Sequence, residues 1–400
     1  MDQKDINELK DAHLEKYIPI IGKHLSSWKD VITEKDAVIF RLSGLSNITC
    51  MVKAKSKSVS PRYVIFRVFD NELCSNELES SVFECLSDQG LGPVCFFQNE
   101  HYRIEQSFDA KPITIFEMRN PVFMKQIIQK TFKLNYNQQL KQTMIDLQGE
   151  KPPTQVEVIQ NDWLPKLRKR FDHLYSLITF DDYIETMDIV KKEFLREDID
   201  EFLNALTFGL YDSTDESGGE KDRNDPLVVS HNDIQECNIL SMRHHASNLA
   251  IIDYEYTSLG NREYDLANIF CELIMDNAYP YFPFIALYPE NCLTKKEFIT
   301  YSKHYLGLYH DNFGVPEETK EQYIERELPV FLENLYCSMI LNGYYWGIWS
   351  ILMIDEKKIN DKIFNFAFAK QRIELTQHLL TLDFIREAVE TKEKKYKEAQ

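Results

Sequence analysis

Two short apolar runs, each followed by an aspartate, constrain the fold of this 400-residue chain more than any other feature. PLVVSHND ends at Asp233, and in NLAIIDYEY the apolar residues are followed directly by Asp253. Both runs are typical of short buried strands. They lie after residue 109, where the spacing of apolar residues otherwise predicts mostly helices. We therefore expect a mainly helical lobe that contains a few strands with polar side chains at their ends.

The sequence before residue 109 predicts a different structure. AVIFRLSG, NITCMVKA, RYVIFRVF, VCFFQ and RIEQSF are each typical of a strand, and ELESSVFECLSDQG predicts a helix after the third strand that stops at Gly90. These elements predict a small antiparallel α+β lobe over residues 36–108. Residues 1–35 have helical spacing and predict a separate N-terminal helical segment.

The predicted organisation is therefore bilobal, with the large helical lobe over residues 109–400 and a hinge near residues 105–111. An acidic stretch at residues 212–225 has no periodicity and predicts a surface loop. The net charge of −18 disfavours nucleic acid as a partner. Eight cysteines form no C-x-x-C pair, and the charged N-terminus resembles no signal peptide. We therefore expect reduced thiols and a cytoplasmic location.

Residues 335–354 (LYCSMILNGYYWGIWSILMI) carry no charge and are numerous enough to span a bilayer. However, the segment contains Asn342, two glycines and three tyrosines. It also has no second apolar segment to pair with and no flanking basic cluster. We predict a buried helix that contributes aromatic side chains to a pocket, without integral membrane association. An amphitropic membrane protein is the alternative.

The pattern His231-Asn232-Asp233-x-x-x-x-Asn238 predicts phosphoryl-transfer chemistry. In the kinase plan, the aspartate of such a loop meets the acceptor hydroxyl, and the asparagine shares Mg²⁺ with an aspartate at the end of the next strand. Asp253 has that position here. Carboxylate and carboxamide oxygens suit Mg²⁺ as ligands. Alternatively, each of these polar residues only caps a turn.

The small lobe contains residues that suit the other half of a nucleotide site. Ser43-Gly44-Leu45-Ser46-Asn47 lies between two predicted strands, where small residues allow backbone N–H groups to approach phosphates. Arg67 occupies the place where protein kinases have their phosphate-pairing lysine, and Glu79 on the next helix would hold it extended. A plain hairpin turn and a surface ion pair are the alternatives.

HNDIQECNIL followed by IDYEYTSLGNREYDLANIFCE resembles the choline/ethanolamine kinase family. SGLSN, VIFRVF, ESSVFECLSDQGLGP, RIEQSF and YYWGIWSI resemble other segments of that family in order, so the resemblance extends from about residue 36 to residue 378. It implies a protein-kinase-like fold, ATP and Mg²⁺ as cofactors, a homodimer, and the first step of phosphatidylcholine synthesis by the CDP-choline route.

The resemblance also implies roles for individual residues. The catalytic group would be Asp233, Asn238 and Asp253, of which Asn238 and Asp253 bind Mg²⁺. The nucleotide-binding residues would be Ser43, Gly44, Leu45, Ser46, Asn47, Ile48, Arg67, Glu79, Gln106 (beside the adenine) and Asp253. The substrate-binding residues would be Asp233, Gln235, Glu255, Tyr256, Glu272, Tyr279, Trp346 and Trp349, with Gln235 and Glu255 supporting the catalytic loop.

An aromatic wall with a nearby carboxylate suits a quaternary ammonium, which has no N–H to donate. Trp346 and Trp349 share a helix face, although core packing also explains that spacing. The sequence departs from the family at Ser43 (usually Gly), at Asn277 (a head-group Tyr) and at Phe368 (a Tyr). None of these departures falls on the predicted catalytic residues.

Together these features predict an ATP-dependent choline kinase that produces phosphocholine and ADP. Ethanolamine kinase or dual activity is the first alternative, although Gln235 and the Cys271-Glu272 pair favour choline. A non-enzymatic kinase-fold scaffold is the second alternative. Such a scaffold would be expected to lose Asp233, Asn238 or Asp253, and the sequence retains all three.

Overall fold

The computed structural model describes residues 16–33, 35–42, 47–69, 75–149, 153–210, 227–243, 245–314, 317–356 and 363–400. The chain forms two compact units. The first contains residues 1–111, 138–149 and 241–257, and the second contains residues 112–137, 150–240 and 258–400. The first unit thus includes two segments from later in the chain. The predicted assignment of functions to residues 1–35, 36–108 and 109–400 stays a prediction.

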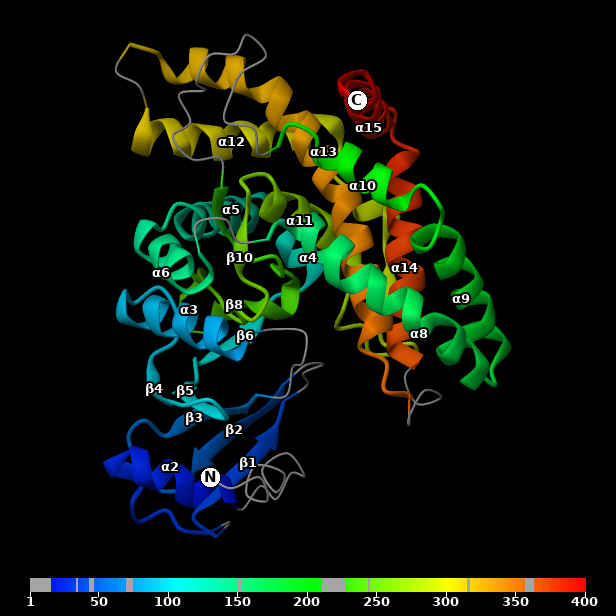
Figure 1. The fold of residues 1–400 in the computed structure, drawn as a ribbon. Helices are drawn as coiled ribbons and strands as arrows, with labels where there is room; N and C mark the ends of the chain where they lie inside the picture. Colours follow the sequence, from blue (N-terminus) through cyan, green and yellow to red (C-terminus); the bar gives the residue numbers. More distant parts are fainter. Residues whose placement is uncertain are drawn as a thin grey trace. The chain divides into compact units, whose positions relative to one another are not determined.

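The first unit is built on a five-stranded antiparallel sheet (Figure 1). Its strands are β1 (Ala37–Arg41), β2 (Ile48–Ala54), β3 (Tyr63–Val68), β4 (Cys95–Gln98) and β5 (Tyr102–Gln106), in the order β1-β2-β3-β5-β4. Helix α3 (Asn76–Asp88) follows the third strand, and Gly90 has a φ of +65° just after it. The five strands and the inserted helix predicted from the sequence are therefore confirmed.

Alternation along β3 gives this sheet one apolar and one charged face. Val64, Phe66 and Val68 belong to the core of the unit, so Arg67 points to the opposite face. Helix α2 (Tyr17–His24) and the 3-10 turn η2 (Ser26–Trp28) pack on the apolar face, where the Tyr17 and Phe66 rings stack at 4.4 Å. The charged face is consequently left for polar contacts.

Segments from later in the chain complete the first unit. Helix α6 (Gln138–Gln148) packs against α3. Strands β6 (Ala110–Pro112), β8 (Ile239–Met242) and β9 (His245–Ile251) form a three-stranded sheet in the order β6-β8-β9. The predicted strand NLAII is thus confirmed as β9, and it ends two residues before Asp253.

The second unit is mostly helical. Its helices are α4 (Ile115–Met118), α5 (Pro121–Asn135), α7 (Gln155–Val158), α8 (Leu164–Leu177), α9 (Asp181–Phe194), α10 (Ile199–Thr207), α11 (Tyr264–Glu272), α12 (Lys295–Phe313), α13 (Lys320–Leu352), α14 (Ile363–Leu380) and α15 (Asp383–Ala399). A π-helical turn, η3 (Ile159–Trp163), joins α7 to α8, and 3-10 turns form at η4 (Glu236–Asn238) and η5 (Pro289–Asn291). The other predicted strand is β7 (Leu227–Ser230), which pairs with β10 (Ser258–Asn261), and β11 (Met275–Asp276) pairs with β12 (Ala286–Leu287).

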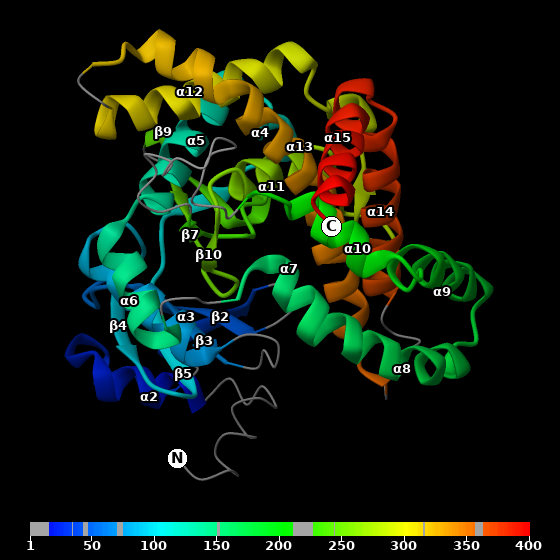
Figure 2. The same cartoon turned by 45° about the horizontal axis from the view of Figure 1, so that its top comes forward.

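Helix α13 forms the centre of the second unit. It packs against α11, α12 and α14, and Figure 2 shows α14 and α15 running alongside it. Residues 334–352 of α13 are all buried, so the apolar segment is a buried helix, as predicted. Within the described ranges, no helix has the length and apolar character that crossing a membrane requires. The seven described cysteines are free thiols, as expected.

Candidate active site

The loop that follows β7 adopts a backbone conformation that favours asparagine. Asn232 has a φ of +70°, in the left-handed region that asparagine tolerates better than most residues. Its side-chain Oδ1 accepts a hydrogen bond from Gln155 (3.0 Å), and its Nδ2 donates to the Ser258 hydroxyl (2.8 Å). These contacts fix the turn immediately before Asp233.

A buried carboxylate on α11 holds the same loop by its backbone. Asp265 accepts hydrogen bonds from the N–H groups of His231 (3.0 Å) and Asn232 (2.9 Å) and from the Asn135 side chain (2.7 Å). Burial raises the pKa of Asp265 against the opposing effect of these donors. Nothing in the local spacing distinguishes Asp265 from an ordinary helix carboxylate, so its role could not be predicted from the sequence.

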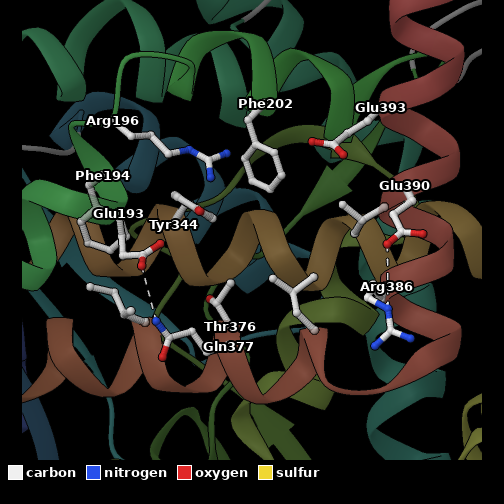
Figure 3. A pocket seen from close by; sticks show the side chains of 13 residues that line it. Glu193, Phe194, Arg196, Phe202, Tyr344, Thr376, Gln377, Arg386, Glu390 and Glu393 are labelled. Carbon is white, nitrogen blue, oxygen red and sulfur yellow. Dashed lines mark hydrogen bonds and ion pairs between the residues drawn. The ribbon is translucent and has the colours of Figure 1, made fainter.

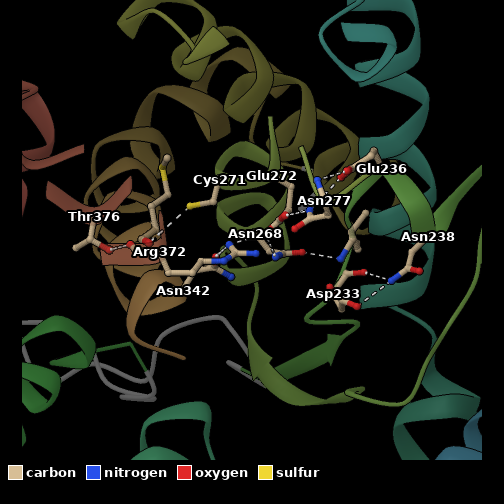
Figure 4. A network of polar contacts seen from close by, with 12 residues as sticks. Asp233, Glu236, Asn238, Asn268, Cys271, Glu272, Asn277, Asn342, Arg372 and Thr376 are labelled. Atoms are coloured by element: carbon tan, nitrogen blue, oxygen red, sulfur yellow. Dashed lines mark hydrogen bonds and ion pairs between the residues drawn. The ribbon is translucent and has the colours of Figure 1, made fainter. Parts of the chain in front are cut away.

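Asp233 and Asn238 lie together, as the kinase plan requires (Figure 4). Asn238 Nδ2 donates to Asp233 Oδ2 at 2.8 Å and to the Asp233 carbonyl oxygen at 3.0 Å. The Ile234 N–H donates to Asn268 on α11 (2.6 Å). Gln235 accepts from the Cys237 N–H (3.2 Å) and thereby caps the turn η4. The carboxylate of Asp233 is therefore oriented by a short, rigid loop.

Glu272, at the end of α11, lies in a buried polar network (Figure 4). Its side chain is 0 % exposed, with Arg372 Nη1 at 2.7 Å from Oε1 and Asn277 Nδ2 at 2.9 Å from Oε2. Asn277 also donates to Glu236, which is buried. Burial, with the charge of Glu272, raises the pKa of Glu236 to about 8. The sequence analysis missed Arg372 and Glu236, which come from distant segments.

The two tryptophans predicted for the head-group site lie on one face of α13. Trp346 and Trp349 are each 3 % exposed, with ring centroids 5.2 Å apart at an interplanar angle of 77°. Trp349 meets Phe368 edge-on at 6.0 Å, and the Arg372 guanidinium lies 4.6 Å from the Phe368 ring. A continuous set of contacts therefore links the tryptophans to Glu272. Tyr279, also predicted for the head-group site, packs its ring edge-on against the ring of Tyr281.

In the first unit, the predicted pairing of Arg67 is observed. Arg67 Nη1 lies 3.2 Å from Glu79 Oε1 and 2.8 Å from Asp253 Oδ1. Asp253 has a φ of +70°, which an aspartate tolerates. Burial disfavours the charged guanidinium, but Asp253 and Glu79 outweigh it and raise the pKa of Arg67 well above its ordinary value.

A second buried arginine, Arg103 on β5, was missed by the sequence analysis. Its Nη2 lies 3.0 Å from the same Glu79 oxygen, its Nε lies 2.7 Å from Glu105, and its guanidinium stacks on Phe83 at 3.7 Å. Arg103 lies opposite Arg67 in the sheet register, on the same face. The alternation of charged and apolar residues in RIEQSF was the signal that could have revealed it.

Most of the other residues predicted to bind the nucleotide or to support the catalytic loop lie in the first unit. Asn47 donates to Glu255 Oε2 at 2.9 Å, and both side chains are buried. Gln106, at the end of β5, accepts from the Val94 N–H (3.1 Å). Ile48 begins β2, and Tyr256 is buried. Ser43, Gly44, Leu45 and Ser46 lie outside the described residues.

Glu79→Ala is expected to lower the free energy of unfolding by about 3 kcal/mol, because Arg67 and Arg103 would each lose a buried partner. Urea unfolding followed by circular dichroism measures this difference. Glu84→Ala, at an exposed position of the same helix, is the matched control and should change stability by less than about 0.5 kcal/mol. Equal effects of the two substitutions would contradict a structural role for the Glu79 cluster.

A cavity of about 280 Å³ lies elsewhere in the second unit, among α9, α10, α13, α14 and α15 (Figure 3). Phe194, Phe202 and Tyr344 line it, and the Arg196 guanidinium lies 4.2 Å from the Phe202 ring. None of the predicted site residues lines this cavity. It is therefore separate from the residues described above.

Asn238 in the second unit and Asp253 in the first unit each carry an oxygen of the kind that Mg²⁺ prefers, the ion that the family resemblance implies. The Asn238 side chain donates to Asp233 through Nδ2, so its carbonyl oxygen faces away from that contact. Asp253 contacts Arg67 through Oδ1. Hard oxygen ligands of this kind suit Mg²⁺, which usually keeps several waters. Among the described residues, no cluster of three or more His, Cys, Asp or Glu side chains forms another metal site.

Solved structures with similar folds were found. A choline kinase from Cryptosporidium parvum superposes with a TM-score of 0.60 at 20 % identity, covering 92 % of this chain and 98 % of that one. An ethanolamine kinase from Plasmodium vivax superposes with a TM-score of 0.56 at 19 % identity, covering 84 % and 83 %. The predicted α+β class, with a small antiparallel sheet and a large helical part, is therefore confirmed. The fold is protein-kinase-like.

Sequence comparison identifies the family within this class. The family model described as choline/ethanolamine kinase matches residues 39–377, so the chain belongs to the choline/ethanolamine kinase family. A human choline/ethanolamine kinase is 27 % identical over 354 residues, covering 85 % of this chain and 80 % of the relative. A probable ethanolamine kinase from Arabidopsis thaliana is 24 % identical over 348 residues, covering 86 % and 79 %.

Proposed function

We propose that this kinase transfers the γ-phosphoryl group of ATP to the hydroxyl of choline in an Mg²⁺-dependent reaction that gives phosphocholine and ADP. The observation that carries this proposal is the fixed pair of Asp233 and Asn238 on a buried loop. Family membership supports phosphoryl transfer to an amino alcohol, and the two tryptophans near Glu272 support choline.

In the proposed reaction, the hydroxyl oxygen of choline forms a bond to the γ-phosphorus, and the bond from that phosphorus to the bridging oxygen breaks. Asp233 orients the hydroxyl and accepts its proton late in the transfer. The hydrogen bond from Asn238 keeps the Asp233 carboxylate in one orientation. Positioning and charge neutralisation then supply most of the rate enhancement.

Asn238 and Asp253 are the proposed protein ligands of Mg²⁺. When bound, the metal neutralises charge that develops on the phosphates. Arg67 is the proposed phosphate contact, and its ion pair with Glu79 holds the guanidinium in place. Residues 43–48 and Gln106 complete the proposed nucleotide site.

The proposed head-group site combines Trp346, Trp349 and Glu272 with Tyr256, and Tyr279 is a further proposed contact. Indole faces attract a trimethylammonium group, whose charge is diffuse and whose surface is apolar. Glu272 supplies the carboxylate, and Arg372 and Asn277 hold it in position. Gln235 and Glu255 are the proposed supports of the catalytic loop.

Trp349→Ala is expected to raise KM for choline by about 3- to 30-fold, because each aromatic face contributes roughly 0.5–2 kcal/mol. KM for ethanolamine should rise less, since a primary ammonium depends more on hydrogen bonds. The measurement is KM for choline and for ethanolamine in the wild type and in each variant. Trp349→Phe retains an aromatic ring, so its KM for choline should lie between the values for the wild type and for Trp349→Ala. Equal losses for the two substrates would show that Trp349 is only a core residue.

A coupled assay of ADP release, with choline and ethanolamine compared at equal concentrations, tests the proposed function directly. Choline should give the higher kcat/KM. No ADP release with either substrate would contradict the proposal and favour the non-enzymatic scaffold, even though Asp233, Asn238 and Asp253 are all present. The homodimer, the cytoplasmic location and the place in phosphatidylcholine synthesis stay predictions.

Ethanolamine kinase activity is the second candidate function. The observation that favours it is the polar group formed by Glu236, Asn277 and Glu272, which offers hydrogen-bond acceptors to an ammonium N–H. The names of a relative and of a solved structure, an ethanolamine kinase in each, are consistent with this candidate. The same assay separates the two candidates by the ratio of their kcat/KM values.

A further inference from the structure

Asn277 joins two buried carboxyl groups in the second unit (Figure 4). Its Nδ2 lies 3.2 Å from Glu236 Oε2 and 2.9 Å from Glu272 Oε2, and its backbone N–H donates to Glu236 Oε1 at 2.6 Å. Glu272 is paired with Arg372 and, as a carboxylate, only accepts hydrogen bonds, so the Asn277 amide must present its nitrogen to Glu272. The chemistry of the neighbours therefore fixes the orientation of the Asn277 amide.

This orientation leaves the carbonyl oxygen of Asn277 as an acceptor without a donor. Oδ1 is buried and has no hydrogen-bond partner within the described part of the chain. Buried carbonyl oxygens are nearly always paired, because an unpaired one loses its hydration without compensation. The unpaired Oδ1 therefore points to a donor that the chain itself does not supply.

The position of Asn277 indicates where that donor comes from. Glu236 follows Asp233 by three residues on the catalytic loop, whereas Glu272 is the proposed carboxylate of the head-group site. From Glu272, the contacts continue through Arg372 and Phe368 to Trp349. Asn277 thus joins the loop that carries Asp233 to the proposed cation site. An N–H on the substrate's ammonium group would supply the missing donor.

We propose that Asn277 is a specificity-determining residue whose Oδ1 accepts one N–H of the substrate's ammonium group, so that tertiary amino alcohols are preferred substrates of this site. The proposal rests on the proposed function. Choline has three methyl groups for the indole faces but no N–H. Ethanolamine has N–H groups but no methyl group. Protonated N,N-dimethylethanolamine has two methyl groups and one N–H, and therefore satisfies both parts of the site.

The test compares kcat/KM for ethanolamine, N-methylethanolamine, N,N-dimethylethanolamine and choline in the wild type and in Asn277→Leu, by ADP release. In the wild type, N,N-dimethylethanolamine should equal or exceed choline. Asn277→Leu should lower the dimethylethanolamine-to-choline ratio by about 10- to 150-fold, the value of one hydrogen bond to a charged donor. The change should appear mainly in KM. Asn312→Leu, at an exposed position of α12, is the matched control and should leave the ratio unchanged.

The ratio distinguishes substrate recognition from a structural role, because a merely structural Asn277 would weaken all four substrates alike. A ratio that is the same within twofold in the wild type and Asn277→Leu overturns the proposal. If Asn277→Leu does not fold, the comparison of substrates in the wild type tests the proposal by itself. In that case, a wild-type kcat/KM for choline more than tenfold above that for N,N-dimethylethanolamine overturns the proposal. Phosphorylation of none of the four would instead refute the proposed function on which this inference rests.

Discussion

Asp253→Asn should reduce phosphoryl transfer by about 10³-fold or more at saturating Mg²⁺. The substitution removes one negative charge from the proposed metal site, where charge stabilisation contributes several kcal/mol to the transition state. The fold should persist, because asparagine tolerates the φ of +70° at this position as well as aspartate does. The measurement is kcat by ADP release across a Mg²⁺ titration.

The loss of the ion pair with Arg67 requires a control in the same experiment, since Asp253 Oδ1 lies 2.8 Å from that guanidinium. Thermal unfolding of Asp253→Asn shows whether activity is lost through instability. Asp198→Asn, which removes an aspartate paired with Arg196 at the surface of the second unit, should keep full activity. Near-normal turnover of Asp253→Asn would show that the metal assignment is wrong.

Asp233→Asn should lower kcat by about 10²–10⁴-fold while nucleotide affinity stays nearly unchanged. The carboxamide retains the shape of the side chain but cannot accept the proton of the acceptor hydroxyl. Its oxygen can still accept the hydrogen bond that Asn238 now donates at 2.8 Å, so the loop should keep its conformation. The measurements are kcat and, separately, the dissociation constant of ATP.

The nucleotide measurement decides between two positions for Asp233 in the site. A large loss of ATP affinity with an intact kcat would place Asp233 at the nucleotide instead of at the acceptor hydroxyl. Asp162→Asn is the matched control, because Asp162 is exposed and forms an ion pair with Lys166 at the surface. It should change neither quantity by more than about twofold.

Much of the fold could be predicted from the sequence because it depends on local spacing. Short β-branched runs bounded by turn residues predicted the five strands of the first unit, and the continuous apolar run before Asp253 predicted the strand there. Asp233 and Asn238 could be paired in advance, since five residues on a tight loop cannot place them far apart. The ion pair of Arg67 with Glu79 followed from the order of strand and helix.

Local spacing by itself therefore determined which residues were predicted to bear the chemistry, whereas only the tertiary structure decided what surrounds them. Asp265 against the loop that carries Asp233, Arg103 beside Glu79 and Arg372 against Glu272 are all contacts between segments far apart in the chain. No periodicity records such contacts, because a buried charge acquires its partner only when separate elements pack together. The unpaired oxygen of Asn277 became visible for the same reason, once the contact with Glu272 had fixed the orientation of its amide.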